Sequence, residues 1–234
     1  MSVHEEIEVK FILLLSKLLD LVQLEALPKQ KIEQAYFSKE RIRQYLIPEL
    51  QKLLPDRLPP EVNYVNGRVR AVEEDGMRSF QITVKGPRED FYSRIEIEVG
   101  IDLALYEKLF KLVDEGSVSK TRHFLAGSLY RQGAALPAVA EIDVMHTAGG
   151  RTVQFEGVPD FAVVEVEVPD RALIELLQKG SHSFEFLKGA YEIAALPEVT
   201  QRTIRMRYFA KYGVDQRVRT VLKELFDKPS TTMG

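Results

Sequence analysis

The stretch Glu6-Ile7-Glu8-Val9-Lys10 is the most informative part of this sequence. Side chains alternate between the two faces of a β-strand, so Glu6, Glu8 and Lys10 would share one face while Ile7 and Val9 occupy the other. Similar pairs of carboxylates return in Glu96-Ile97-Glu98-Val99 and in Glu165-Val166-Glu167-Val168. Carboxylates that recur on separate strands need water, cationic side chains or metal ions around them. Which of these surrounds the carboxylates therefore decides the kind of function that they serve.

Composition limits the classes of protein to be considered. The chain has 234 residues, of which 45% are hydrophobic and 29% charged, as in soluble globular proteins. A net charge of −3 gives no basic excess, so no nucleic-acid partner is expected. The absence of cysteine excludes disulfides, thiolate catalysis and cysteine-bound zinc. Because no apolar stretch is long enough for a membrane span or a secretory signal, we expect a cytoplasmic protein without membrane contact.

Hydrophobic periodicity predicts a mixture of strands and helices. Alternating segments bounded by turn residues predict strands at 5–11, 31–37, 62–65, 67–73, 79–85, 93–99, 117–125, 138–146, 151–156 and 163–168, with a hairpin turn at 148–150. Helical spacing predicts helices at 12–24, 41–54, 102–114 and 171–179, and a helical region from 198 to 226. No linker divides these elements.

The charged residues of the predicted strands collect on one face of each strand. This face would carry Glu6, Glu8, Lys10, Arg68, Arg70, Gln81, Thr83, Lys85, Arg94, Glu96, Glu98, Lys120, Arg122, Glu141, Asp143, Glu165 and Glu167. For one strand alone, a polar face turned to water is the simpler explanation. For the whole set, a closed sheet with charges inside and helices against the apolar outside accounts for every strand. The sequence therefore predicts an α+β fold, an antiparallel β-barrel or deeply curved sheet with helices packed outside.

In its charged motifs the chain resembles the CYTH domains, also called triphosphate tunnel metalloenzymes. The Glu-x-Glu-x-Lys motif stands at 6–10, and further motifs follow in the order of that family. They are Ile32–Phe37, Arg68-Val69-Arg70, Thr83-Val84-Lys85-Gly86, Glu96-Ile97-Glu98, Lys120-Thr121-Arg122, Glu141-Ile142-Asp143, Glu165-Val166-Glu167 and Glu198-Val199-Thr200. The resemblance implies an eight-stranded antiparallel β-barrel, the triphosphate tunnel, over residues 1–200. We expect residues 201–228 to be a helical extension of that domain and 229–234 a flexible tail.

The resemblance also implies roles for the charged residues. Glu6, Glu8, Glu165, Glu167 and Asp143 would bind Mg²⁺ or Mn²⁺. Triphosphate oxygens would be bound by Lys10, Arg68, Arg70, Lys85, Lys120 and Arg122. Lys10 and Glu8 are the catalytic candidates, and Lys10 would assist either the attacking water or the leaving phosphate. Glu96, Glu98 and Glu141 would support the basic residues. The four histidines show no ligand spacing, so we expect them to be structural.

Three functions are compatible with this set of residues. The first is metal-dependent hydrolysis of a triphosphate, either inorganic tripolyphosphate or a nucleoside triphosphate, with release of phosphate. The second is a class IV type of adenylyl cyclase, which would make cyclic AMP and pyrophosphate in the same kind of tunnel. The third is a polyphosphate- or nucleotide-binding module without catalysis, which would not require the paired acids. The partner is in each case a small triphosphate-containing molecule, and the sequence leaves a homodimer open.

Overall fold

The structure is a computed structural model, which describes residues 2–55, 58, 63–88, 92–146, 160–192, 220, 223 and 224. The predicted elements at 148–150, 151–156 and 198–226, the Glu198-Val199-Thr200 motif and the predicted tail lie wholly or almost wholly outside these residues. In the described part of the chain, no helix is long and apolar enough to cross a membrane.

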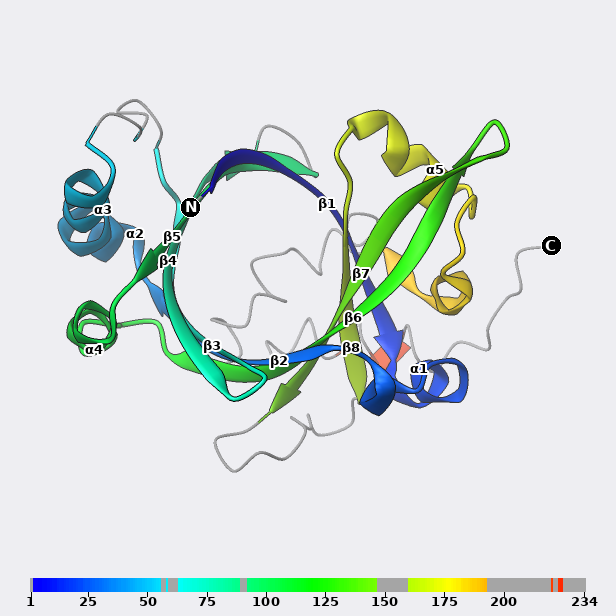
Figure 1. Cartoon of the computed structure of the whole chain (residues 1–234), viewed down its shortest axis with the longest axis horizontal. Coiled ribbons are helices and arrows are strands. Elements are labelled where there is room, and N and C mark those ends of the chain that lie inside the picture. The colour runs from blue at the N-terminus through cyan, green and yellow to red at the C-terminus, as the bar shows by residue number, and fades with distance from the viewer. Residues whose placement is uncertain are drawn as a thin grey trace.

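Eight antiparallel strands form a closed ring (Figure 1). In chain order they are β1 Ser2–Leu14, β2 Lys29–Phe37, β3 Asn66–Glu74, β4 Met77–Arg88, β5 Ser93–Ile101, β6 Ser117–Arg131, β7 Ala134–His146 and β8 Phe161–Glu167. Around the ring the order is β5, β4, β3, β2, β6, β7, β8 and β1, and β1 pairs again with β5. A short strand, β9 Tyr191–Glu192, adds to β1.

Strand β1 closes the ring because its two halves have different partners. Its first half pairs with β5, with Glu6 opposite Arg94, and its second half pairs with β8, with Lys10 opposite Glu165. The register of a strand fixes which side chains face inward, because a shift of one residue would reverse every side chain. This register turns Glu6, Glu8 and Lys10 into the ring, where they line its cavity.

Helices cover the outside of the ring in two groups (Figure 1). The helices are α1 Leu15–Leu21, α2 Lys39–Arg41, α3 Ile47–Leu53, α4 Leu103–Phe110 and α5 Ile174–Gln178, and the π-helical turn Ile42–Leu46 joins α2 to α3. One apolar core lies beneath α2, α3 and α4 and includes Phe37 and Leu109. A second core lies beneath α1 and α5 and includes Phe11 and Leu177. Each fully buried side chain of this size contributes about 1.5–3 kcal/mol of hydrophobic stabilisation. Packing against the helices therefore keeps the apolar faces of the strands on the outside of the ring.

The predicted fold class is confirmed, with an uneven ring of eight strands and helices outside. Three local predictions were wrong. Residues 63–65 lie in no strand, and the segment predicted as a helix from Ile12 continues β1 as far as Leu14. Strands β6 and β7 are much longer than predicted and meet in a hairpin at Gln132 and Gly133. Both turn residues have positive φ, 50° and 83°, as a two-residue hairpin turn requires.

Candidate active site: the charged interior of the ring

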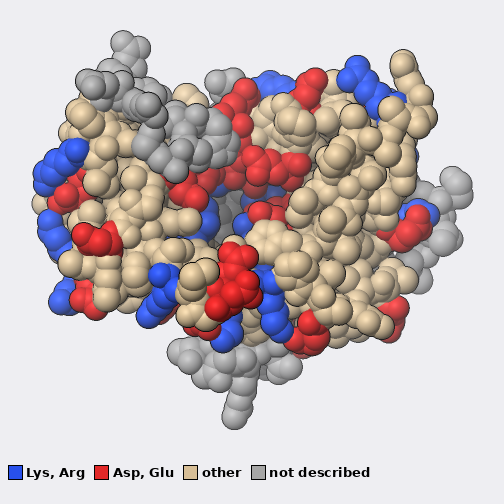
Figure 2. Space-filling model, in the orientation of Figure 1, with Lys and Arg blue, Asp and Glu red and all other residues tan. Residues whose placement is uncertain are grey.

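The interior of the ring is a cavity of about 730 Å³ lined mainly by charged side chains. Figure 2 shows the hollow at the centre of the ring, with acidic and basic side chains around it. Every charged residue assigned a role in the sequence analysis lines this cavity: Glu6, Glu8, Lys10, Arg68, Arg70, Lys85, Glu96, Glu98, Lys120, Arg122, Glu141, Asp143, Glu165 and Glu167. The charged positions of the period-two pattern thus lie on the inner face of the ring.

Basic and acidic side chains are unevenly distributed around the ring, although Lys10, Lys85 and Arg94 lie among the carboxylates. The inner face of β3 carries Arg68 and Arg70, and that of β6 carries Lys120 and Arg122. Between them, β2 contributes only uncharged residues such as Gln34. The carboxylates lie mainly on the neighbouring strands β5, β1, β8 and β7, on the other side of the ring. An anion and metal ions bound together would fit this distribution of charge.

One network of ion pairs surrounds Glu6. Lys85 Nζ donates to both carboxylate oxygens of Glu6 at 2.6 and 2.8 Å, and it also pairs with Glu96. Arg94 Nε donates to Glu6 Oε2 at 2.7 Å. Burial by itself raises the pKa of Glu96, but Lys85 and Arg68 lower it to about 2. This network therefore holds its carboxylates ionised at neutral pH.

A second network surrounds Arg122. Its guanidinium donates to Asp143 at 2.7 and 2.8 Å and to Glu165 Oε2 at 2.9 Å, and it also pairs with Glu141. Lys120 pairs with Asp143, and Lys10 pairs with Glu165. Burial and the neighbouring Arg122 lower the pKa of Lys120 to about 7. Five cation–carboxylate pairings thus meet at the junction of β1, β6, β7 and β8.

Glu8 connects the two networks. Its side chain is 4% exposed; Arg94 donates to its Oε1 at 3.1 Å, and Lys10 lies 2.9 Å from its Oε2. Arg94 belongs to the first network and Lys10 to the second. A change in the charge of Glu8 would therefore alter the ion pairing in both networks.

Arg70, like Arg68, is weakly paired in the described interior. Its nearest carboxylate oxygen belongs to Glu98 at 3.6 Å, and its buried Nε has no hydrogen-bond partner among the described residues. Burial, together with the charges of Arg68 and Arg122, lowers the pKa of Arg70 to about 10. A bound anion would relieve this crowding of positive charge.

The chemistry of the acidic side suits a hard divalent cation, because carboxylate oxygens are the preferred ligands of Mg²⁺ and Mn²⁺. Glu8 and Glu167 are cross-strand partners, and Glu165 lies on the same inner face. Within the described residues, no three carboxylates already form a group that could hold a metal ion. Instead, Lys10, Arg94 and Arg122 pair with these acids. The donor set thus fits a metal, and binding would require the acids to exchange cationic partners.

The structure adds residues to which the sequence analysis gave no role. Arg94 bridges Glu6 and Glu8, and its place in the alternation before Glu96 was the signal that could have identified it. Gln34, Asn66 and Gln81 also line the cavity, and in the described part of the chain the side-chain oxygen of each lacks a donor. Uncharged amides do not stand out in a sequence, so no signal there identifies them as site residues. Of the histidines, His123 and His182 are buried and do not line the cavity.

A closed ring of eight antiparallel strands, with charges inside and helices outside, is the architecture that the resemblance implied. We call the closed ring with its charged interior the tunnel. The predicted resemblance is therefore confirmed at the level of the fold.

Several solved structures are similar to this tunnel. The PH1819 protein from Pyrococcus horikoshii OT3 matches with a TM-score of 0.44 and 21% identity, over 74% of this chain and 87% of that chain. The inorganic triphosphatase NE1496 matches with a TM-score of 0.33 and 19% identity, over 73% and 80%. A Bacillus halodurans protein, bh2851, described as a candidate adenylate cyclase, matches with 0.38 and 12%, over 75% and 88%. No protein-family model and no curated protein matches the sequence.

Proposed function

We propose that the tunnel binds a triphosphate together with Mg²⁺ or Mn²⁺ and hydrolyses it with release of phosphate. The observation that supports this most is the crowding of Arg68, Arg70, Lys120 and Arg122, in which burial and neighbouring cations lower the pKa of Arg70 to about 10. Unpaired positive charge in a buried cavity favours a strongly anionic ligand. Phosphate oxygens match guanidinium groups in both charge and geometry.

The basic side would bind and orient the phosphates. Arg68 and Arg70 follow one another on the inner face of β3, and Lys120 and Arg122 do so on β6. Phosphoryl transfer depends chiefly on position and on neutralisation of charge, which this arrangement would supply. Lys85, which is buried between Glu6 and Glu96, would neutralise charge at the β4 side.

The acidic side would hold the metal ions. Glu8, Glu165 and Glu167 lie together on the inner faces of the paired strands β1 and β8. Glu6 and Asp143 complete the predicted ligands. When bound, the metal would neutralise phosphate charge and polarise a water molecule. Lys10 donates to Glu165 and lies beside Glu8, so its ammonium is placed to stabilise charge on a phosphate that approaches these acids.

Product analysis tests this function directly. The protein is incubated with Mg²⁺ or Mn²⁺ and either tripolyphosphate or ATP, and phosphate, pyrophosphate and cyclic AMP are measured. We expect phosphate release that falls about 100-fold or more in Glu8→Gln, as for a single catalytic group. The matched control is Glu73→Gln, because Glu73 pairs with Lys31 at 3.0 Å and neither residue is among those that line the tunnel.

The other outcomes identify the alternatives. Cyclic AMP with pyrophosphate would indicate a cyclase and overturn hydrolysis as the reaction. Saturable binding of triphosphate without any product would indicate a binding module, and the catalytic roles of Glu8 and Lys10 would be wrong.

A further inference from the structure

Two side-chain amides, the buried Gln34 and the half-buried Gln81, lie on either side of Arg70. Gln34 on β2 and Gln81 on β4 are both cross-strand partners of Arg70, and all three line the tunnel. Gln34 is 1% exposed, and its Nε2 donates to the hydroxyl of Tyr36 at 2.7 Å. Within the described residues, neither Gln34 Oε1 nor Gln81 Oε1 receives a hydrogen bond. A buried acceptor without a donor is unfavourable, so these two oxygens favour a ligand that brings donors.

Unfilled space lies beside one of these amides. Gly100 on β5 is the cross-strand partner of Gln81, so a side chain at this position would point to the same side of the sheet. A Cβ atom added to Gly100 would meet only the backbone oxygen of Phe80, at 4.0 Å. Gly100 is an exposed residue near the end of β5, so this open space lies at the rim of the ring, beside Gln81.

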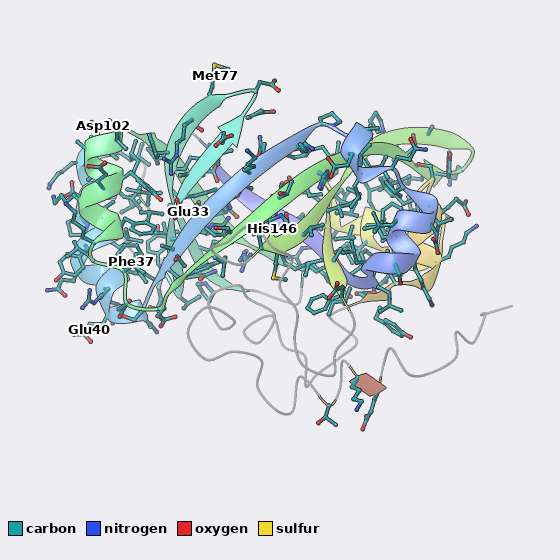
Figure 3. The ribbon with its side chains drawn as sticks, turned by 90° about the horizontal axis from the view of Figure 1, so that it is seen from below. Glu33, Phe37, Glu40, Met77, Asp102 and His146 are labelled. Atoms are coloured by element: carbon teal, nitrogen blue, oxygen red, sulfur yellow. The ribbon has the colours of Figure 1, made fainter. Side chains whose placement is uncertain are left out.

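The same end of the tunnel supplies acceptors and an apolar surface. Because adjacent strands are antiparallel, the β3–β4 turn, the start of β2 and the ends of β5 and β6 lie at one end of the ring, where Figure 3 shows Met77. The lining there includes Glu74, Glu98 and the ring of Phe124. Arg78 also lines this end, but it pairs with Glu33 at 3.2 Å.

The residues that line this end would favour some groups attached to a triphosphate over others. An additional phosphate at this end would meet the carboxylates of Glu74 and Glu98, which repel it. A hydroxyl or amino group would donate to the same atoms, and a flat ring would pack against Phe124. The two ends of a bound ligand are therefore expected to differ in chemistry.

We propose that Gln34, Gln81 and the space at Gly100 form a subsite for the organic group of a triphosphate ester whose hydroxyl or amino groups lie next to the phosphates. A ribonucleoside triphosphate is the simplest ligand of this class. The proposal rests on the proposed function, and it makes inorganic tripolyphosphate and tetraphosphate the poorer ligands of this tunnel.

Kinetics with ATP and tripolyphosphate test the subsite. The Gly100→Val substitution fills the space, and Gly100→Ala is the matched control, since its Cβ meets almost nothing. We expect the KM for ATP, divided by that for tripolyphosphate, to rise about tenfold or more in Gly100→Val and to stay constant in Gly100→Ala. Thermal unfolding of both variants checks that the fold is retained.

The role of the Gln81 amide is tested with a nucleotide that lacks the ribose hydroxyl donors. In the wild-type protein, 2′,3′-dideoxy-ATP should bind several-fold more weakly than ATP in calorimetric titrations. In Gln81→Leu, which removes the acceptor, the two nucleotides should bind with similar affinity. Equal binding of both nucleotides by the wild-type protein would overturn the role of the amides.

Failure of the subsite and failure of hydrolysis give different results. Rapid phosphate release from tripolyphosphate, with no preference for ATP and parallel effects of Gly100→Val on both substrates, would overturn the subsite and leave hydrolysis in place. Binding of ATP that is weakened by Gly100→Val, without release of phosphate, would support the subsite and overturn hydrolysis.

Discussion

Arg122 on β6 holds Asp143 on β7 through two parallel hydrogen bonds of 2.7 and 2.8 Å inside the tunnel. The two residues are cross-strand partners, and Asp143 is 2% exposed. Register therefore brings opposite charges together in a place from which water is largely excluded. Such a pair is far more costly to break than to replace, because the remaining charge is left buried.

The Asp143→Asn substitution should therefore destabilise the fold. It leaves Arg122 and Lys120 without their shared carboxylate, and the expected loss in the free energy of unfolding is about 3–5 kcal/mol. Urea denaturation measures this loss. The control is Asp20→Asn, because Asp20 is an exposed residue of α1. If both variants unfold at the same urea concentration, the pair has no structural role.

Arg94 should compete with a divalent metal for the same carboxylates. It is 5% exposed and contacts both Glu6 and Glu8, so Arg94→Gln leaves these acids with fewer cationic partners. We expect the melting temperature of Arg94→Gln to fall in EDTA and to be raised by Mg²⁺ more than that of the wild-type protein.

The control for this prediction is Arg43→Gln. Arg43 contacts Asn63 at 2.9 Å on the exposed surface, so its loss should leave the response to Mg²⁺ unchanged. Equal Mg²⁺ shifts in wild-type protein and Arg94→Gln would mean that Glu6 and Glu8 do not take part in metal binding.

Stability should fall as the pH is lowered from about 7 to 5. Burial lowers the pKa of His123, whose Nδ1 lies 2.9 Å from the carbonyl oxygen of Leu24. Burial also lowers the pKa of His146 and His182. The unfolded chain, in which histidine has a pKa of about 6.5, then binds more protons than the folded chain in this range, so acid favours unfolding.

Urea denaturation at several pH values checks this dependence. His123→Gln removes one of the three titrating groups, so its stability should change less between pH 7 and pH 5 than that of the wild-type protein. An identical pH dependence in the two proteins would show that His123 titrates normally.

Gly127 should be intolerant of a side chain, although it lies outside the tunnel. A Cβ at this position would stand 2.4 Å from Cε1 of Phe184, whose ring is almost completely buried. Gly127→Ala should lower the free energy of unfolding by about 1–3 kcal/mol, as overpacking does, without changing triphosphate binding. Gly100→Ala is the control, because a Cβ there would meet only the backbone oxygen of Phe80, at 4.0 Å. Equal melting temperatures for the two variants would contradict this packing.

The inner face of the tunnel could be predicted from the sequence because period two fixes the side to which a residue points. Glu6, Glu8 and Lys10 follow this rule, and the apolar residues between them pack beneath helices. The end of β1 could not be predicted, because Ile12-Leu13-Leu14 is uniformly apolar and shows neither period.

The partners of the charged residues could not be predicted either. Arg94 meets Glu6 across 88 positions of sequence, and only the pairing of β1 with β5 brings them together. Gln34 and Gln81 depend in the same way on the pairing of β2, β3 and β4. Long-range register, and not local pattern, decides these contacts.

The claim that the tunnel is a triphosphate site is tested by calorimetric titration with tripolyphosphate in Mg²⁺. Wild-type protein should bind with one saturable site, and Arg70→Gln should bind about tenfold more weakly or worse, because the carboxylate oxygen nearest to Arg70 lies 3.6 Å away and the Nε of Arg70 has no hydrogen-bond partner among the described residues. Absence of saturable binding by the wild-type protein, or equal affinity in Arg70→Gln, would contradict the claim.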